Sequence, residues 1–369
     1  MSLETFIDTR FGDPVLALSL NYEAVVYGSA VGRVLYYNFD TQTERVIKEV
    51  CEECVRGLWL ALDSTTYVAI GDLKCLVLVR PGSSDMNLQL IHHERVHSIT
   101  NCPYTQVLMF EDNVCIAVLE PQSEFASLAA PAYSCSLFVT NLNSQSTKMF
   151  SSGKFSMESV LLDFDGAKLL WVEWVDVGLR SLHVFFFAMN ENRTLLSGLK
   201  NTFGEITFGK LLNDRILLVL NGQRFVLLDI NSDSQVELFQ TGDEVVAMTA
   251  FVQNVPQRSS LQTSQLRGSE VQPDSMLGLE EESKARAQNY KLICVAVCQN
   301  GAVQVYEHSK QVEEIQFCEL LELTARYQRA QYFSMGYPYI VAAYGPRIAL
   351  STDLGVLILR SRYLESVSI

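Results

Sequence analysis

VVYGSAVGRVLYYNFDTQT, residues 25 to 43, consists of two short apolar runs, each followed by residues that favour a turn. Every second residue of these runs is apolar or aromatic, which is the period of a β-strand: Val25, Tyr27, Val34 and Tyr36. The turn chemistry comes from Gly28, Gly32 and Asp40. The stretch therefore predicts a strand, a turn, a second strand and a second turn.

The same order of strand and turn signals returns twice. ILLVLNGQRFVLLDINS, residues 216 to 232, places Asn221-Gly222 between two apolar runs, and LICVAVCQNGAVQVYEHS, residues 292 to 309, does the same with Asn300-Gly301. Asn-Gly is strongly favoured in two-residue hairpins because both positions accept a positive φ. Three such hairpins indicate a repeated unit.

The stretch that begins IHHERVHSITNCPY at residue 91 resembles one blade of a WD-repeat propeller. In that family a Gly-His pair precedes the inner strand, a Ser-Pro turn follows it, and a Trp-Asp pair closes the third strand. The matching positions here are His92, Val96 and Cys102-Pro103, with Tyr37-Asn38 and Tyr306-Glu307 where Trp-Asp usually stands. The resemblance implies an all-β propeller of four-stranded blades.

The chain also departs from the repeat. It has no Gly-His pair, and none of its three tryptophans is followed by aspartate: Trp59, Trp171 and Trp174. The polar network that the family builds inside each blade is therefore expected to be missing. We expect apolar packing alone to hold the blades, as in degenerate members.

Seven blades account for the chain when they are assigned to residues 15–49, 55–93, 95–152, 157–200, 203–240, 245–317 and 325–360. This spacing is near the roughly 40 to 45 residues of a WD-type blade. We therefore expect residues 1–369 to form a single domain, a seven-bladed WD40-like β-propeller. LETFIDT, residues 3–9, could add the outer strand that closes the ring. Strand register stays open in 105–152 and in 347–360.

Two segments interrupt the pattern. Residues 253–289, within the sixth blade, are rich in Ser, Gln, Pro and Glu, and such a composition predicts a disordered insertion because it buries too little apolar area. The insertion is read either as a tolerated surface loop or as a regulated docking segment. Residues 313–330 fit an amphipathic helix, but they equally fit an outer strand that runs into a loop.

Composition excludes several classes of function. The chain has 28 basic and 42 acidic residues, a net charge of −14, and no run of Lys or Arg that could neutralise a row of phosphates. Direct nucleic-acid binding is not expected, and contact with an anionic membrane surface is disfavoured. The sequence offers no secretory signal and no apolar run long enough for a transmembrane helix. Nine cysteines in apolar contexts favour a reducing, cytoplasmic compartment.

No motif predicts a catalytic, cofactor-binding or metal-binding residue. HERVH, residues 93–97, matches a zinc-protease motif, but that chemistry needs a helix and the flanks predict strands. Cys51 and Cys54 form a lone C-x-x-C with only two of four zinc ligands, so a turn between blades is favoured. His183 and His308 have no nucleophile motif beside them, and the sequon at Asn192 is idle in the cytosol.

Two tryptophans and a run of phenylalanines are expected in the core of a blade, although the spacing does not tell which face is buried: Trp171, Trp174 and the run from Phe185 to Phe187. The function expected from this reading is a non-enzymatic scaffold subunit that mediates protein–protein interactions in a eukaryotic multiprotein complex. The alternatives are a phosphoinositide-binding propeller, for which an adjacent arginine pair is missing, and a propeller enzyme with a site in the central channel.

Overall fold

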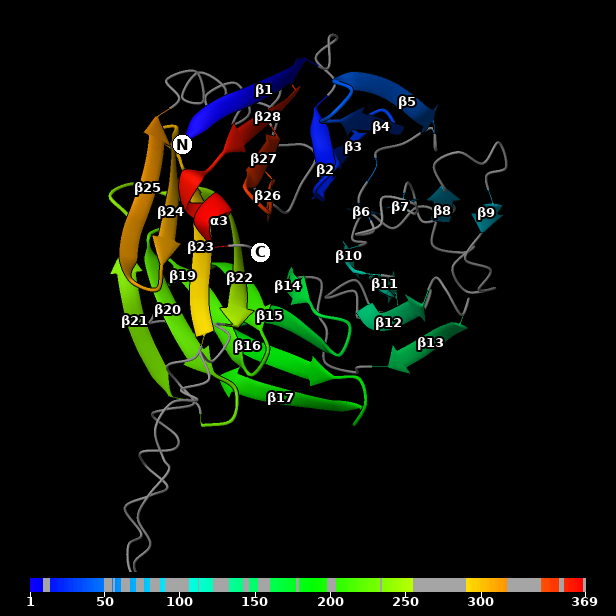
Figure 1. Ribbon diagram of the computed structural model, residues 1–369. Helices are drawn as coiled ribbons and strands as arrows, with labels where there is room; N and C mark the ends of the chain where they lie inside the picture. Colours follow the sequence, from blue (N-terminus) through cyan, green and yellow to red (C-terminus); the bar gives the residue numbers. More distant parts are fainter. Residues whose placement is uncertain are drawn as a thin grey trace, which may run out of the picture.

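The computed structural model describes the chain in segments separated by gaps: residues 1–8, 14–49, 55, 57–60, 67–70, 76–79, 87–89, 106–111, 113–121, 133–141, 146–151, 160–176, 179–197, 204–232, 234–254, 290–316, 340–351 and 355–367. These residues form seven antiparallel sheets of four strands each. The sheets are set around a common centre (Figure 1).

The strands of each sheet follow one another from the centre to the rim. The first strands, nearest the centre, are β2 (Val15–Leu20), β6 (Gly57–Leu60), β10 (Gln106–Phe110), β14 (Val160–Phe164), β18 (Ile206–Leu212), β22 (Val245–Asn254) and β26 (Val341–Tyr344). The second strands are β3 (Ala24–Ser29), β7 (Tyr67–Ile70), β11 (Asn113–Pro121), β15 (Lys168–Asp176), β19 (Arg215–Leu220), β23 (Tyr290–Cys298) and β27 (Arg347–Ser351).

The third strands are β4 (Arg33–Asn38), β8 (Leu76–Val79), β12 (Tyr133–Asn141), β16 (Leu179–Phe186), β20 (Arg224–Asp229), β24 (Ala302–Glu307) and β28 (Gly355–Arg360). The outer strands are β5 (Thr43–Glu49), β9 (Asn87–Gln89), β13 (Ser146–Ser151), β17 (Glu191–Leu196), β21 (Gln235–Gln240), β25 (Lys310–Gln316) and β1 (Ser2–Asp8). A short helix, α3 (Arg362–Ser366), follows β28.

The sheets close into a ring. Each first strand packs against the first strand of the next sheet, from β2 through β6, β10, β14, β18 and β22 to β26, and β26 packs on β2. In the seventh sheet the outer strand is β1, which runs antiparallel to β28. The N-terminal strand, which contains most of LETFIDT, thus completes the sheet built by the last three strands (Figure 1).

The all-β propeller expected from the sequence is confirmed, and the seven sheets agree with the expected number of blades. The described residues between 106 and 151 form the four strands of one sheet, and the open register near the C-terminus resolves into β27 and β28. Gln253 and Asn254 end β22, while residues 255–289 of the expected insertion lie outside the described residues. Glu313 to Gln316 belong to a strand rather than a helix, and residues 317–330 also lie outside the described residues.

The second strands are buried on both faces. All six residues of β3 are buried, whereas the period of two read from Val25 and Tyr27 suggests a single buried face. β19 and β23 are buried along most of their lengths in the same way. Each blade has a neighbour on both sides, so a strand in its middle reads as a continuous apolar run.

Apolar packing between neighbouring blades forms the core. Separate clusters join the third and fourth sheets, the fourth and fifth, the fifth and sixth, the sixth and seventh, and the seventh and first. Gly28 permits one close approach, because a Cβ atom built there would lie 2.3 Å from Cγ1 of the buried Val55. Gly209 plays the same part against Leu170 of the preceding blade.

Four of the sheets share a pair of β-bulges that the sequence does not reveal. In the first, fourth, fifth and sixth sheets the register of the inner strand shifts at its second or third residue, leaving one residue extra: Leu16, Leu162, Thr207 and Val246. The same four sheets shift again between their third and outer strands. A bulge increases local twist, so repeated bulges give these blades a common twist.

Candidate interaction site at the ring closure

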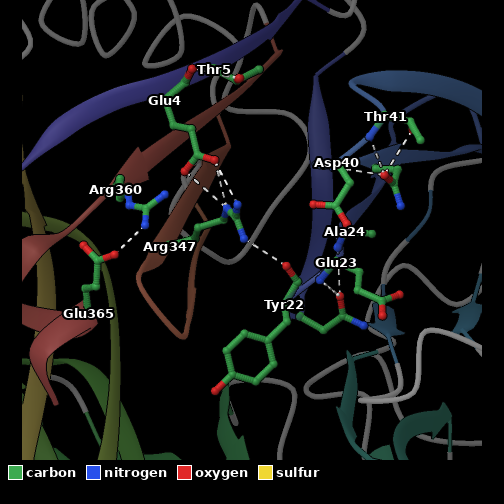
Figure 2. Close-up of polar contacts among 12 residues, drawn as sticks. Glu4, Thr5, Tyr22, Glu23, Ala24, Asp40, Thr41, Arg347, Arg360 and Glu365 are labelled. Carbon is green, nitrogen blue, oxygen red and sulfur yellow. Dashed lines mark hydrogen bonds and ion pairs between the residues drawn. The ribbon is translucent and has the colours of Figure 1, made fainter. Parts of the chain in front are cut away.

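The first and seventh sheets meet at a cluster of turns where the ring closes. The β2–β3 turn, the loop after β4 and the β26–β27 turn lie together, with β1 beside them (Figure 2). We call this region the closure site and define it by Glu4, Tyr22, Phe39, Tyr344 and Arg347. Its residues come from opposite ends of the sequence.

Arg347 links the parts of the closure site. Its guanidinium donates to both carboxylate oxygens of Glu4 at 3.0 to 3.2 Å and to the backbone carbonyl of Tyr22 at 2.9 Å (Figure 2). The same guanidinium lies 4.2 Å from the ring centroid of Phe39. The side chains of Arg347 and Glu4 are 15% and 26% exposed, so the ion pair is largely shielded from water. A planar, bidentate contact of this kind fixes orientation as well as charge.

Tyr22 is presented to solvent at the tip of the β2–β3 turn. It is 50% exposed, and its ring packs edge-on against Tyr344 at 4.7 Å. Two features favour glycine at position 345: its φ is +55°, and a Cβ atom there would lie 2.7 Å from the Tyr22 ring. Burial, followed by the proximity of Tyr22, raises the pKa of the Tyr344 hydroxyl.

Asparagine side chains hold the two turns of the first sheet. The Asn21 carboxamide oxygen accepts from the backbone N–H groups of Glu23 and Ala24, both at 2.9 Å. The Asn38 carboxamide oxygen accepts from Asp40 and Thr41 (Figure 2). Such Asx turns fix the backbone at both tips. Exposed carboxylates of Glu23 and Asp40 therefore flank Tyr22 on a rigid support.

Helix α3 extends the same face toward the sixth sheet. Arg360 pairs with Glu365 of the helix (Figure 2). At its start, Glu313 of β25 accepts from the Ser361 hydroxyl and from the backbone N–H groups of Arg362 and Tyr363. Burial alone would raise the Glu313 pKa, but these hydrogen bonds and the N-terminal amine outweigh it and lower that pKa. The contacts dock the helix on the neighbouring blade.

The fourth sheet contains a polar network, so the expectation that apolar packing alone holds the blades is wrong there. His183 is 4% exposed and stacks on Trp171 with ring centroids 4.1 Å apart. Its Nδ1 lies 3.0 Å from the Thr194 hydroxyl and its Nε2 lies 3.4 Å from Glu173. These residues sit on three adjacent strands of one sheet. The sequence does not reveal this network, because its residues are spaced differently from those of the WD-repeat network.

The other candidate residues have plain structural positions or lie outside the described residues. HERVH at 93–97, His92, Cys102-Pro103, Cys51 and Cys54 fall outside them, as does the side chain of Trp174. Trp171 and Phe185 are buried in the core, as predicted, whereas Phe186 and Phe187 are partly buried and pack against it. Asn192 of the sequon accepts a hydrogen bond from the Trp171 indole. His308 occupies the β24–β25 turn with φ of +52°. Among the described residues, no three His, Cys, Asp or Glu side chains are placed to hold a metal ion.

The Trp-Asp equivalents lie where the resemblance predicts. Tyr37-Asn38 ends β4 and Tyr306-Glu307 ends β24, and both are third strands. A third equivalent, Leu228-Asp229 at the end of β20, was missed. Asp229 accepts from Asn231 and Ser232 much as Asn38 accepts from Asp40 and Thr41. The shared Asx-x-x-Ser/Thr spacing was the signal that could have found it.

Comparison with solved structures agrees with this architecture. The WD40 β-propeller domain of Doa1 superposes with a TM-score of 0.56 at 9% identity, covering 98% of this chain and 96% of that one. The computationally designed Ika8 protein superposes with a TM-score of 0.50 at 10% identity, covering 97% and 98%. No protein-family model and no curated protein matches the sequence. The chain has the fold of a WD40 β-propeller.

A search for membrane-spanning helices gives a simple result. Within the segments that the structure describes, no helix is long and apolar enough to cross a bilayer.

Proposed function

We propose that this protein is a non-enzymatic scaffold subunit that holds protein partners within a cytoplasmic, eukaryotic multiprotein complex. The observation that carries the proposal is the closure site, where a half-exposed tyrosine stands on turns that hydrogen bonds hold in place. Function on a propeller resides in such surfaces rather than in the fold itself. The WD40 likeness supports binding of proteins as the general role.

Tyr22 has the properties of an interface anchor. Tyrosine supplies a large contact area and a hydrogen-bonding hydroxyl, and it is enriched where binding energy concentrates. Its turn is already fixed by Asn21 and Arg347, so little backbone entropy remains to be lost on binding. The neighbouring carboxylates of Glu23 and Asp40 favour a partner surface with basic residues.

Affinity isolation of the tagged full chain from eukaryotic cells, with mass spectrometry of co-purifying proteins, tests the proposal. Tyr22→Ala should lose partners that the wild type retains, because it removes the anchor without touching the Arg347 contacts. Met189→Ala is the matched control, since Met189 is an exposed apolar residue on another blade. Recovery of the chain alone as a monomer would contradict the scaffold role. Equal recovery of partner proteins by the two variants would show that the partners bind a surface other than the closure site.

A further inference from the structure

The outer strand β1 exposes two large apolar side chains. Leu3 and Phe6 are 49% and 44% exposed, so two of the protein's exposed large apolar residues lie on one seven-residue strand. β5, β13, β17, β21 and β25 each carry an exposed charged side chain, for example Arg45, Lys148, Glu191, Glu237 and Glu314. Exposed charge is one of the usual protections of a sheet edge against pairing.

Of the two acidic residues of β1, Glu4 is engaged in an ion pair with Arg347, and the side chain of Asp8 lies outside the described residues. Leu3 pairs with Leu359 and Thr5 with Ile358, so Glu4 is the extra residue of a bulge. Its carboxylate is held by Arg347, and the register places Leu3 and Phe6 opposite Leu359 and Leu357. Leu357 and Leu359 belong to the cluster between the sixth and seventh sheets. Leu3 and Phe6 therefore share one side of the strand, next to this cluster.

The edge of β1 away from β28 is unpaired among the described residues. We propose that this edge binds an extended segment of a partner protein, which adds as a fifth strand to the seventh sheet. Main-chain hydrogen bonds give such binding its affinity, and side chains at alternate positions give its specificity. This inference rests on the proposed scaffold function and names one of its binding surfaces.

The chemistry of the edge defines the segment. Apolar side chains on one side would cover Leu3 and Phe6, which removes exposed apolar area from water. The chain carries a net charge of −14, so a segment with lysine or arginine at the intervening positions is favoured and an acidic one is repelled. A second copy of this chain would bring the same negative charge to the contact. The charge therefore favours a basic, amphipathic strand from a different protein.

A synthetic peptide tests the edge directly. The probe is a capped nonapeptide, Lys-Val-Thr-Val-Lys-Val-Thr-Val-Lys, titrated against the full chain, with hydrogen exchange of residues 2–8 as the structural readout. We expect binding to slow exchange in this strand. Phe6→Lys should weaken binding about ten-fold or more, whereas Val236→Lys on the edge of β21 is the matched control and should not. Thermal melting of both variants verifies folding.

N-methylated peptides separate strand addition from simple apolar contact. Amides of alternate residues face opposite edges of a strand, so methylation at all valines and methylation at all other positions should have different effects. Only one of the two methylated peptides should keep its affinity. Binding by both, no binding of the parent peptide, or equal affinity of the Phe6→Lys and Val236→Lys variants would each overturn the proposal. Partner recovery by wild-type protein would then still support the scaffold role, so the two hypotheses fail separately.

Discussion

Replacing Arg347 with leucine removes the polar contacts of its side chain at the ring closure. The guanidinium makes charge-assisted hydrogen bonds to Glu4 and one hydrogen bond to the Tyr22 carbonyl. A hydrogen bond to a charged group contributes about 1.5 to 3 kcal/mol, and loss of one partner leaves the other unpaired. Breaking a fully buried pair costs about 3 to 5 kcal/mol, but this pair is partly exposed, so we expect a loss of about 2 to 3 kcal/mol.

Urea unfolding followed by circular dichroism measures this loss. With an unfolding entropy of about 2.1 cal/mol/K per residue, a chain of 369 residues should lower its Tm by only roughly 3 °C, so the denaturant midpoint is the more sensitive readout. Hydrogen exchange should accelerate first in β1, because Arg347 joins that strand to the neighbouring blade.

A matched control is the ion pair between Arg224 and Glu237, which is more exposed at both side chains. Arg224→Leu should cost less than about 1 kcal/mol, as surface pairs do. A double-mutant cycle with Glu4→Gln and Arg347→Leu should give a coupling free energy of about 1 to 2 kcal/mol. If Arg347→Leu is no more destabilising than Arg224→Leu, the reasoning about the closure is refuted.

Three further predictions concern other parts of the ring. Gly28→Ala should destabilise the protein by about 1 to 3 kcal/mol, because the new Cβ would overlap Val55. Gly242→Ala should change the urea midpoint little, because a Cβ there would have no atom within 4 Å. Equal effects of the two substitutions would contradict the packing argument. Burial, and then Asp243 and Glu314, raise the pKa of Cys298 to about 12, and burial also raises the pKa of Cys294. Iodoacetamide at pH 8 should therefore label neither thiol in native protein. Rapid labelling seen by mass spectrometry would disprove this. The Tyr363 hydroxyl and then Lys291 lower the pKa of Glu307 below its ordinary 4.5. The ionised carboxylate therefore stabilises the folded protein fully above that value, and this stabilisation is lost as pH falls through the lowered pKa. The stability difference between wild type and Glu307→Gln should shrink on acidification, and a constant difference would exclude the effect.

The turns illustrate how far local sequence reaches. Asn221 and Gly222 both adopt positive φ, and Gln223 N–H closes the turn on Leu220, as the Asn-Gly signal predicts. At Asn300-Gly301 only the glycine has positive φ, and Gly301 N–H closes an earlier turn on Cys298. Both loops have three residues, but the dipeptide fills the first two positions of one loop and the last two of the other, so it takes part in a different turn.

Local sequence signals of this kind do not predict the candidate site. Arg347 and Glu4 are 343 residues apart, and neither lies in a motif with a known spacing. Tyr22 has no sequence signal other than its place in a predicted turn. The fourth blade's network likewise depends on which residues face each other across β15, β16 and β17, and a bulge between Leu182 and His183 sets that register.

The amino-acid sequence alone determined the four-stranded unit, its repetition and the all-β class, because strand period and turn chemistry act between residues a few positions apart. Tertiary structure decided which side chains meet where the ring closes and how the outer strand β1 is held there. These features depend on closing the circle, which brings β1 beside β28 and the first blade beside the seventh. Contacts of that range follow from the sum of all seven blades, and no single stretch of sequence encodes them.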